Sequence, residues 1–178
     1  MAAMYAALLR GVNVGGRGKI SMPELVRAFE LLGHEDVRSY IQSGNVVFRS
    51  KVSNPARVSA ALERSIAESL GLETRVIVRT HPELQAIAAG SPFDEDVHVV
   101  FLDSVPSPAR VATLDPERSP GDRFEVAGRE IYLSLASGAG RTKLTLDWLE
   151  RGLGVSGTQR NWNTLLKLVE LTAARADG

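Results

Sequence analysis

The alternation of apolar and polar residues over positions 1–80 predicts four strands and two helices. Short apolar runs bounded by turn residues are typical of strands, whereas apolar residues at every third or fourth position are typical of amphipathic helices. The predicted order is strand, helix, strand, strand, helix, strand, which is the split β-α-β arrangement of ferredoxin-like folds. We expect strands at 4–10, 37–41, 46–48 and 74–78, a helix between Ser21 and Gly33, and a helix between Asn54 and Gly71.

The start of the first helix carries a clear signal. Ser21 is followed three residues later by Glu24, which is the capping-box pattern, and Pro23 stands in the first turn, where its missing N–H costs nothing. Leu25 and Phe29 then begin an apolar face at helical spacing. The chain is therefore expected to enter a helix directly after residue 21.

The second half nearly repeats this order. The pattern predicts a helix at 81–89, a strand at 97–102, a helical turn at 106–113, a hairpin of strands at 123–126 and 131–135, a helix at 144–151 and a last helix from about Asn161. This is β-α-β-β-α with a further helix in place of a fourth strand. We predict an α+β protein with a ferredoxin-like subdomain at 1–80 and a related second subdomain at 81–178 that includes the C-terminal helix, without a clear sequence repeat.

Composition is that of a globular protein. Of the 178 residues, 44% are hydrophobic and 24% charged, and Lys plus Arg (21) equals Asp plus Glu (21), so no overall charge directs the chain to nucleic acid or to a membrane surface. The absence of cysteine excludes disulfides, thiolate metal sites and cysteine nucleophiles. Because the sequence has neither a signal peptide nor about 20 consecutive apolar residues, we expect a cytoplasmic protein.

The segment 8–21 is the strongest candidate for a binding site. It places four glycines, an asparagine and three cations between an apolar strand and a capped helix. Glycine-rich backbone amides, cations and a helix N-terminus together are how proteins hold phosphates and other anions. The segment is not a Walker A motif, because Gly18-Lys19 is followed by Ile20, and it does not match the Gly-x-Gly-x-x-Gly pattern of dinucleotide-binding loops.

Topology gives this segment neighbours. In a split β-α-β sheet of order 4-1-3-2, the end of the first strand lies beside the start of the third, so polar residues about 35 positions apart are expected to cluster. The alternative is that these loops only turn the chain and that their charges belong to the solvated surface. The predicted ligand-binding residues of this cluster are Arg10, Asn13, Gly15, Gly16, Lys19, Ser43 and Asn45.

Two later segments have a similar polar character. Residues 137–143 combine small residues with two cations, and residues 158–164 gather hydrogen-bonding groups at the start of the last helix. Lys143, Arg160 and Asn163 are therefore further candidates, facing the first loop across a cleft between the two halves. The alternative for the last segment is structural: Asn161 caps the helix and Trp162 packs in the core, which we prefer for Trp162.

No reaction chemistry stands out. His34, His81 and His98 lack the spacing of metal ligands, so no metal site is predicted, and no residue recommends itself as a general base. Asp103, at a strand end, is a single carboxylate. RNA-recognition modules share the predicted strand order, but the third strand here keeps only one aromatic, Phe48. Whether the chain catalyses a reaction or uses a cofactor stays open.

Three stretches together resemble the bacterial family called domain of unknown function 1697. They are Leu8–Gly16 (LLRGVNVGG), Tyr40–Phe48 (YIQSGNVVF) and Thr158–Thr164 (TQRNWNT), and Lys143-Leu144 also matches a family position. The likeness covers nearly the whole chain in the expected order, with Gln159 in place of a commoner threonine. It implies an α+β protein of two subdomains and carries no activity.

These observations lead to one hypothesis and two alternatives. The leading hypothesis is a cytoplasmic protein that binds a small anionic or phosphate-bearing ligand at the glycine-rich first loop and the cleft between the subdomains. Arg10 and Lys19 would supply charge, and Asn13 and Asn45 would orient the ligand. The first alternative is a protein interaction module or homodimer without a small ligand, and the weaker one is nucleic-acid binding.

Overall fold

The protein, seen in a computed structural model, is described at residues 2–11, 20–40 and 44–173. The chain forms two compact units: one takes in the residues up to Gln85 and those from Lys167 on, and the other runs over Ala86–Leu166. Each unit is built around its own four-stranded sheet. The domain boundaries predicted from sequence, 1–80 and 81–178, stay a prediction.

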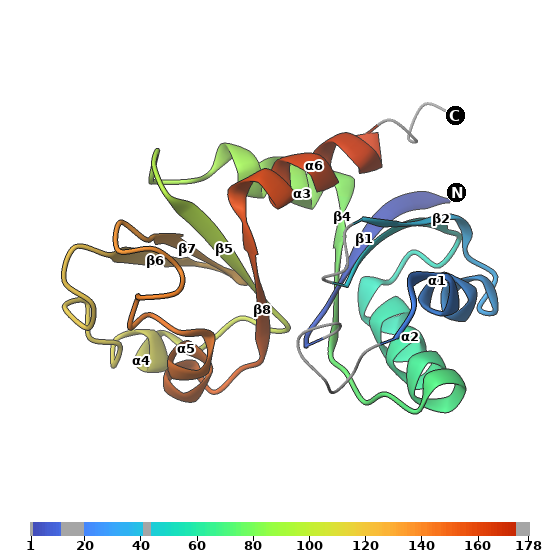
Figure 1. Cartoon of the computed structure of the whole chain (residues 1–178), viewed down its shortest axis with the longest axis horizontal. Helices are drawn as coiled ribbons and strands as arrows, with labels where there is room; N and C mark the ends of the chain where they lie inside the picture. Colours follow the sequence, from blue (N-terminus) through green and yellow to red (C-terminus); the bar gives the residue numbers. More distant parts are fainter. Residues whose placement is uncertain (1, 12–19, 41–43, 174–178) are drawn as a thin grey trace. The chain divides into compact units, whose positions relative to one another are not determined.

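The first sheet has the predicted ferredoxin-like order. Its strands lie in the order β2-β3-β1-β4, and every neighbouring pair is antiparallel. The two helices of the split β-α-β unit cover one face of the sheet (Figure 1). The elements are β1 (Ala3–Leu9), α1 (Met22–Glu30), β2 (Glu35–Tyr40), β3 (Asn45–Ser50), α2 (Pro55–Leu70) and β4 (Val76–Thr80).

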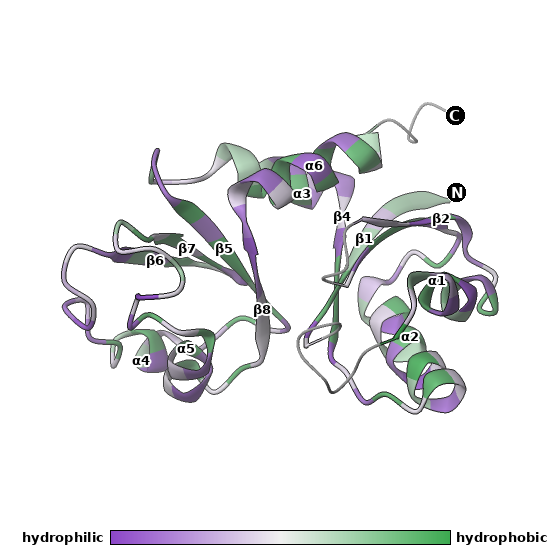
Figure 2. Ribbon diagram, viewed as in Figure 1, coloured by the Kyte–Doolittle hydropathy of each residue, from purple (hydrophilic) through white to green (hydrophobic). Residues whose placement is uncertain are grey.

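An aromatic cluster anchors the core between this sheet and its helices. The ring of Phe48 stacks on Tyr5 at a centroid distance of 5.7 Å and meets Phe29 of α1 edge-on at 5.2 Å. Leu62 and Ile66 of α2 complete the buried layer. Figure 2 shows both apolar and polar residues along α1 and α2, as expected of helices with one face against a sheet.

Local sequence signals fix where these helices begin and end. Ser21 Oγ accepts from the backbone N–H of Glu24 at 3.3 Å while Glu24 accepts from the N–H of Ser21 at 3.2 Å, so the predicted capping box is confirmed. Asn54 caps α2 through a 3.0 Å bond from the N–H of Ala56, and Gly71 ends α2 with φ +64°. Only glycine adopts that backbone conformation without strain.

The second unit carries the same topology. Its sheet has the antiparallel order β6-β7-β5-β8, with α4 and α5 on one face (Figure 1). Buried leucines of β5, β7 and α5 form its core, among them Leu102, Leu133 and Leu149. The elements are β5 (Val97–Leu102), α4 (Pro108–Val111), β6 (Arg123–Ala127), β7 (Glu130–Ser134), α5 (Leu146–Leu153) and β8 (Gly157–Asn161).

The fourth strand β8 corrects the predicted element order. The α+β, ferredoxin-like class and the C-terminal helix are confirmed, but the helix follows a fourth strand and does not replace it. The sequence Gly-Thr-Gln-Arg-Asn has no apolar alternation, so the pattern does not indicate a strand. β8 forms because it lies at the edge of the sheet, where backbone hydrogen bonds to β5 suffice to hold a polar segment.

A helix follows the edge strand directly in both halves. α3 (His81–Ala89) begins one residue after β4 ends, and α6 (Trp162–Ala173) begins one residue after β8 ends. The chain therefore runs twice through the order β-α-β-β-α-β-α, a repeat that the residues themselves do not reveal. No helix in the described ranges is long and apolar enough to span a bilayer.

Candidate functional site

The predicted meeting of strand ends in the first sheet is confirmed for the described residues. β1 and β3 pair so that Leu8 lies opposite Asn45, and the N–H of Leu9 donates to the carbonyl of Gly44 at 2.9 Å. On the other side of β1, the N–H of Arg10 donates to the carbonyl of Arg75 at 3.2 Å. The end of β1 thus lies between the start of β3 and the start of β4, and we call this the first edge.

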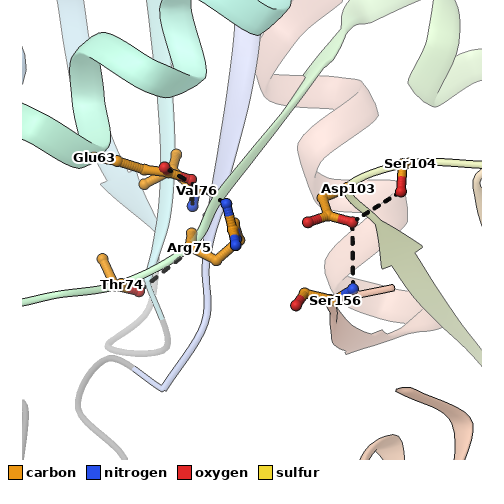
Figure 3. Close-up of polar contacts among 7 residues, drawn as sticks. All are labelled: Glu63, Thr74, Arg75, Val76, Asp103, Ser104 and Ser156. Atoms are coloured by element: carbon orange, nitrogen blue, oxygen red, sulfur yellow. Dashed lines mark hydrogen bonds and ion pairs between the residues drawn. The ribbon is translucent and has the colours of Figure 1, made fainter. Parts of the chain in front are cut away.

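Two arginines stand next to each other at the first edge. Arg10 and Arg75 are both exposed and continue the antiparallel register by one position beyond the Leu9–Val76 pair, so they lie directly across from each other. Thr74 Oγ1 donates to the carbonyl of Arg10 at 2.7 Å, which fixes the backbone there. Glu63 of α2 accepts from the N–H of Val76 at 2.9 Å and lies 3.9 Å from the guanidinium of Arg75 (Figure 3).

Asn45 has a structural contact at this edge. Its side chain is fully buried, and its Nδ2 donates to the carbonyl of Tyr40 at 3.2 Å, which ties the end of β2 to the start of β3. A buried amide must be hydrogen-bonded, because leaving it unpaired costs about 1–3 kcal/mol. The residue therefore contributes to the hairpin whether or not it also orients a ligand.

The rest of the predicted first-loop cluster lies outside the described residues. These are Asn13, Gly15, Gly16, Lys19 and Ser43. The described residues on either side of the loop are Gly11, with φ +71°, and the capping box that starts α1.

The segment around Lys143 is organised by a carboxylate of the protein itself. Asp122 is buried and accepts from the backbone N–H of Ser137 at 3.0 Å and from the hydroxyl of Ser119 at 2.7 Å. The backbone N–H of Lys143 donates in turn to the hydroxyl of Ser119 at 3.1 Å, while the Lys143 side chain is exposed. An internal anion thus already uses donors of this loop, which could otherwise have held a ligand.

These contacts also set the charge of Asp122. Burial by itself raises the pKa of a carboxyl group, but hydrogen bonds from Ser137, Ser119 and Thr142 favour the ionised form and outweigh it. The pKa of Asp122 falls from 3.8 to about 2. Asp122 is therefore ionised at neutral pH and places a negative charge beside Ser119 and Ser137.

Arg160 is buried in the second sheet. It lies on β8 opposite Val99, and its Nη1 donates to the hydroxyl of Thr158 at 2.6 Å and to the carbonyl of Gln159 at 2.9 Å. Burial lowers the pKa of the Arg160 guanidinium from 12.5 to about 10, so it stays charged at neutral pH. Its contacts within β8 are those of a structural residue, and its predicted role toward a ligand stays a prediction.

The start of α6 is partly as predicted. Asn161 Oδ1 accepts from the N–H of Thr164 at 2.9 Å, so the expected cap is confirmed. Trp162 is only half-buried, and it lines a surface pocket together with the exposed Asn163. Trp162 is therefore not one of the fully buried core residues, and the expectation that it packs in the core stays a prediction.

A second buried arginine, Arg79, escaped sequence analysis. Arg79 and Arg160 both occupy the second-to-last position of the edge strand that precedes a helix, opposite Ala6 and Val99 of the central strands. Each donates its Nη1 to the carbonyl of the residue before it, at 3.1 Å in Arg79 and 2.9 Å in Arg160. In the sequence, each arginine stands two residues before a helix. Their equivalence is visible only when β8 is recognised as a strand that corresponds to β4.

The same alignment pairs Arg10 with Asp103. Each is the residue directly after the central strand, and each donates its backbone N–H to a carbonyl before the edge strand: Arg10 to Arg75, and Asp103 to Ser156 at 2.9 Å. Asp103 Oδ1 also accepts from the N–H of Ser156 and the hydroxyl of Ser104, both at 3.3 Å (Figure 3). The residue that follows the central strand is therefore cationic in the first sheet and anionic in the second.

The described side chains do not form a metal centre. Over residues 2–11, 20–40 and 44–173, no group of three or more His, Asp and Glu side chains is placed to hold a metal ion. His34 is buried against Phe48, and its burial lowers the pKa of its imidazole. Its place in the core is that of a packing residue.

The two four-stranded sheets define a tandem α+β protein of two ferredoxin-like units. A model of the family described as a protein of unknown function (DUF1697) matches residues 2–132, and the chain belongs to this family. A solved structure of a conserved bacterial protein from Streptococcus pneumoniae is similar over 97% of this chain and 99% of that one, with 25% sequence identity and a TM-score of 0.74. No curated protein matches the sequence.

Proposed function

We propose that the protein binds a small anionic ligand, such as a phosphate-bearing metabolite, at the first edge. The observation that carries the proposal is the pair Arg10 and Arg75, exposed and directly opposite each other at adjacent strand ends. Two like charges in that register repel each other, and an anion between them, adding to the Glu63 carboxylate that lies 3.9 Å from Arg75, turns the repulsion into attraction. Guanidinium groups bind phosphate and carboxylate through paired N–H donors, which favours oxyanions over halides.

The sequence next to this pair supports the same ligand class. Residues 11–19 supply glycine amides, Asn13 and Lys19, and the chain then enters α1 through the capping box at Ser21. Backbone donors and cations in front of a helix N-terminus are a common anion site.

Calorimetric titration with inorganic phosphate, pyrophosphate and sulfate at low salt tests the proposal. We expect saturable binding of at least one oxyanion, weakened about tenfold or more by Arg10→Ala and by Arg75→Ala, because a hydrogen bond to a charged group contributes about 1.5–3 kcal/mol. Arg64→Ala is the matched control, since Arg64 is an exposed arginine of α2 in the same unit. If no oxyanion binds, or if all three variants bind as the wild type does, the proposal is wrong.

A second candidate is an interaction module whose first edge only holds the fold together. The bonds from Thr74 to the carbonyl of Arg10 and from Asn45 to the carbonyl of Tyr40 favour it, since both are internal contacts of this edge. This alternative predicts that Arg10→Ala lowers the melting temperature although no oxyanion stabilises the wild type. A ligand at ten times its Kd stabilises by about 1.4 kcal/mol, so thermal unfolding with and without phosphate separates the two.

Nucleic-acid binding through the first sheet has less support. RNA-recognition modules stack bases on aromatics of the open sheet face. Here Phe48 of β3 and Tyr5 of β1 belong to the core beneath α1 and α2. Titration with a single-stranded RNA at low and high salt provides the check, because binding to the phosphate backbone weakens steeply with salt.

A further inference from the structure

A pocket of about 240 Å³ lies at the other end of the second sheet, where β5 begins and β8 ends. The register places His98 of β5 opposite Asn161 of β8, so the residues before β5 and the first residues of α6 meet around it. The side chains that give the pocket its chemistry are Asp94, Asp96, His98, Asn161, Trp162 and Asn163.

The charge of this lining is negative. Asp94 and Asp96 are exposed carboxylates, and no lysine or arginine is among the lining residues. His98 adds no positive charge at neutral pH, because burial lowers the pKa of its imidazole, although Asp96 acts in the opposite direction. The ring of His98 is held by Gln159, whose Nε2 lies 3.4 Å from His98 Nδ1.

An aromatic wall accompanies the carboxylates. Trp162 is half-buried, and the cap formed by Asn161 on Thr164 fixes the first turn of the helix that carries it. A tryptophan ring attracts cations through its electron-rich face, and this attraction grows when the cation is partly desolvated. Carboxylates beside an aromatic ring in a small pocket are suited to an ammonium or guanidinium group on a short aliphatic chain.

Other occupants fit less well. A metal ion is disfavoured, because the described side chains include no group of three or more His, Asp and Glu placed to hold one. An anion would meet two carboxylates. A purely structural explanation also exists, since carboxylates near a helix N-terminus stabilise the helix without any ligand. That explanation does not account for the pocket or for the place of Trp162 in its lining.

We propose that this pocket binds a small organic cation, with Asp94 and Asp96 as counter-ions and Trp162 as the aromatic wall. The site is separate from the first edge, so it stands or falls independently of the proposed anion ligand. Asn163, which sequence analysis assigned to an anion, would instead accept from the N–H groups of the cation through its amide oxygen.

The two tryptophans of the chain make a direct test. In a ¹H–¹⁵N spectrum each indole N–H gives its own signal, and Trp148→Phe assigns them. Trp148 packs on Phe124 in the same unit, so its signal is the internal control. On titration with agmatine at fixed ionic strength we expect a saturable shift of the Trp162 signal, with a Kd of about 1 mM or tighter, and no shift of the Trp148 signal.

Charge-neutralising variants decide whether the carboxylates are responsible. Asp94→Asn with Asp96→Asn is expected to weaken agmatine binding at least about tenfold, whereas Glu117→Gln, an exposed residue of the same unit, leaves it unchanged. The spectra of the variants show whether they are folded. The proposal is overturned if the Trp162 signal does not shift, if it shifts equally with sodium chloride, or if the double variant binds agmatine as the wild type does.

Discussion

The two sheets have the same topology, but the residue that follows the central strand carries opposite charges in the two units. After the central strand, the first unit has Arg10 beside Arg75, and the second has Asp103 beside Ser156. The main-chain hydrogen bond between the neighbouring segments is the same in both. The backbone contact is thus common to both units, whereas the residue type at this place differs between them. This difference is why we assign an anion to the first unit and not to the second.

The buried arginines teach the converse lesson. Arg79 and Arg160 occupy equivalent positions and make an equivalent bond to the preceding carbonyl. Here both the place and the residue type recur, which indicates a requirement of the fold that the two units share. The surroundings differ at the acceptor: Thr158 gives Arg160 a hydroxyl, whereas the equivalent residue of the first unit is Ile77.

The largest effect is expected from the equivalent core positions Phe48 and Leu133. Both are fully buried on the third strand of their units, opposite Tyr5 and His98. Phe48→Ala removes the ring that contacts Tyr5 and Phe29 and should lower the free energy of unfolding by about 3–5 kcal/mol, against about 2–5 kcal/mol for Leu133→Ala. Urea denaturation followed by circular dichroism measures both. A loss below 1 kcal/mol at either position would contradict its place in the core of its unit.

The hydroxyl of Thr158 tests the difference between the buried arginines. Thr158→Val leaves a buried guanidinium N–H without this acceptor and should cost about 1–3 kcal/mol. Ile77→Val is the matched change in the first unit, and it removes a methylene group but no acceptor. In an Arg160→Met background the cost of Thr158→Val should shrink, which a double-mutant cycle by urea denaturation measures. Equal costs in both backgrounds would exclude the proposed coupling.

In the second unit, the contact between Asp122 and Ser137, in the loop after the third strand, should respond to pH. The pKa of Asp122 is depressed from 3.8 to about 2. The ionised carboxylate therefore contributes its full stabilisation to the folded state above about pH 5, and this stabilisation is lost as the pH falls toward 2. The difference in unfolding free energy between the wild type and Asp122→Asn should fall by about 2 kcal/mol between pH 5 and pH 2. A difference that does not change with pH would contradict the ionised carboxylate.

Ser50, the last residue of the third strand of the first unit, offers a neutral comparison with Asp122. There the hydroxyl of Ser50 accepts from the N–H of Val52 at 3.0 Å, and a neutral hydroxyl does not titrate in this range. Ser50→Ala should therefore change stability by the same amount at pH 5 and at pH 2. Denaturation of this variant at the two pH values is the matched control for Asp122→Asn.

The smallest effects are expected from the helix caps, where the two units should agree. Asn54 caps α2 and Thr145 caps α5, each through a side-chain oxygen that accepts a backbone N–H near the helix start. Asn54→Ala and Thr145→Ala should each cost about 1 kcal/mol, because each leaves one helix donor to water. Thermal unfolding measures both, and Ala60→Gly in the exposed middle of α2 gives a helix-propensity change of similar size for scale.

Much of the fold was open to prediction because its signals are local. The capping box at Ser21, the cap at Asn54 and the left-handed Gly71 depend on a few adjacent residues, and the structure confirms all three. The strand β8, in contrast, was not predicted from the sequence. A polar edge strand forms through backbone pairing with its neighbour, here β5, and the residues of the segment itself carry no sign of that pairing.

The candidate sites divide in the same way. Sequence alone determined that Arg10 stands at the end of an apolar run and that residues 8–21 are rich in glycine and cations, since residue type and spacing are properties of the chain. Only the tertiary structure decided that Arg75 lies opposite Arg10, that Asp122 occupies the donors near Lys143, and that Asp94 and Asp96 share a pocket with Trp162. Each of these depends on strand register, which places residues far apart in sequence within a few ångströms of one another.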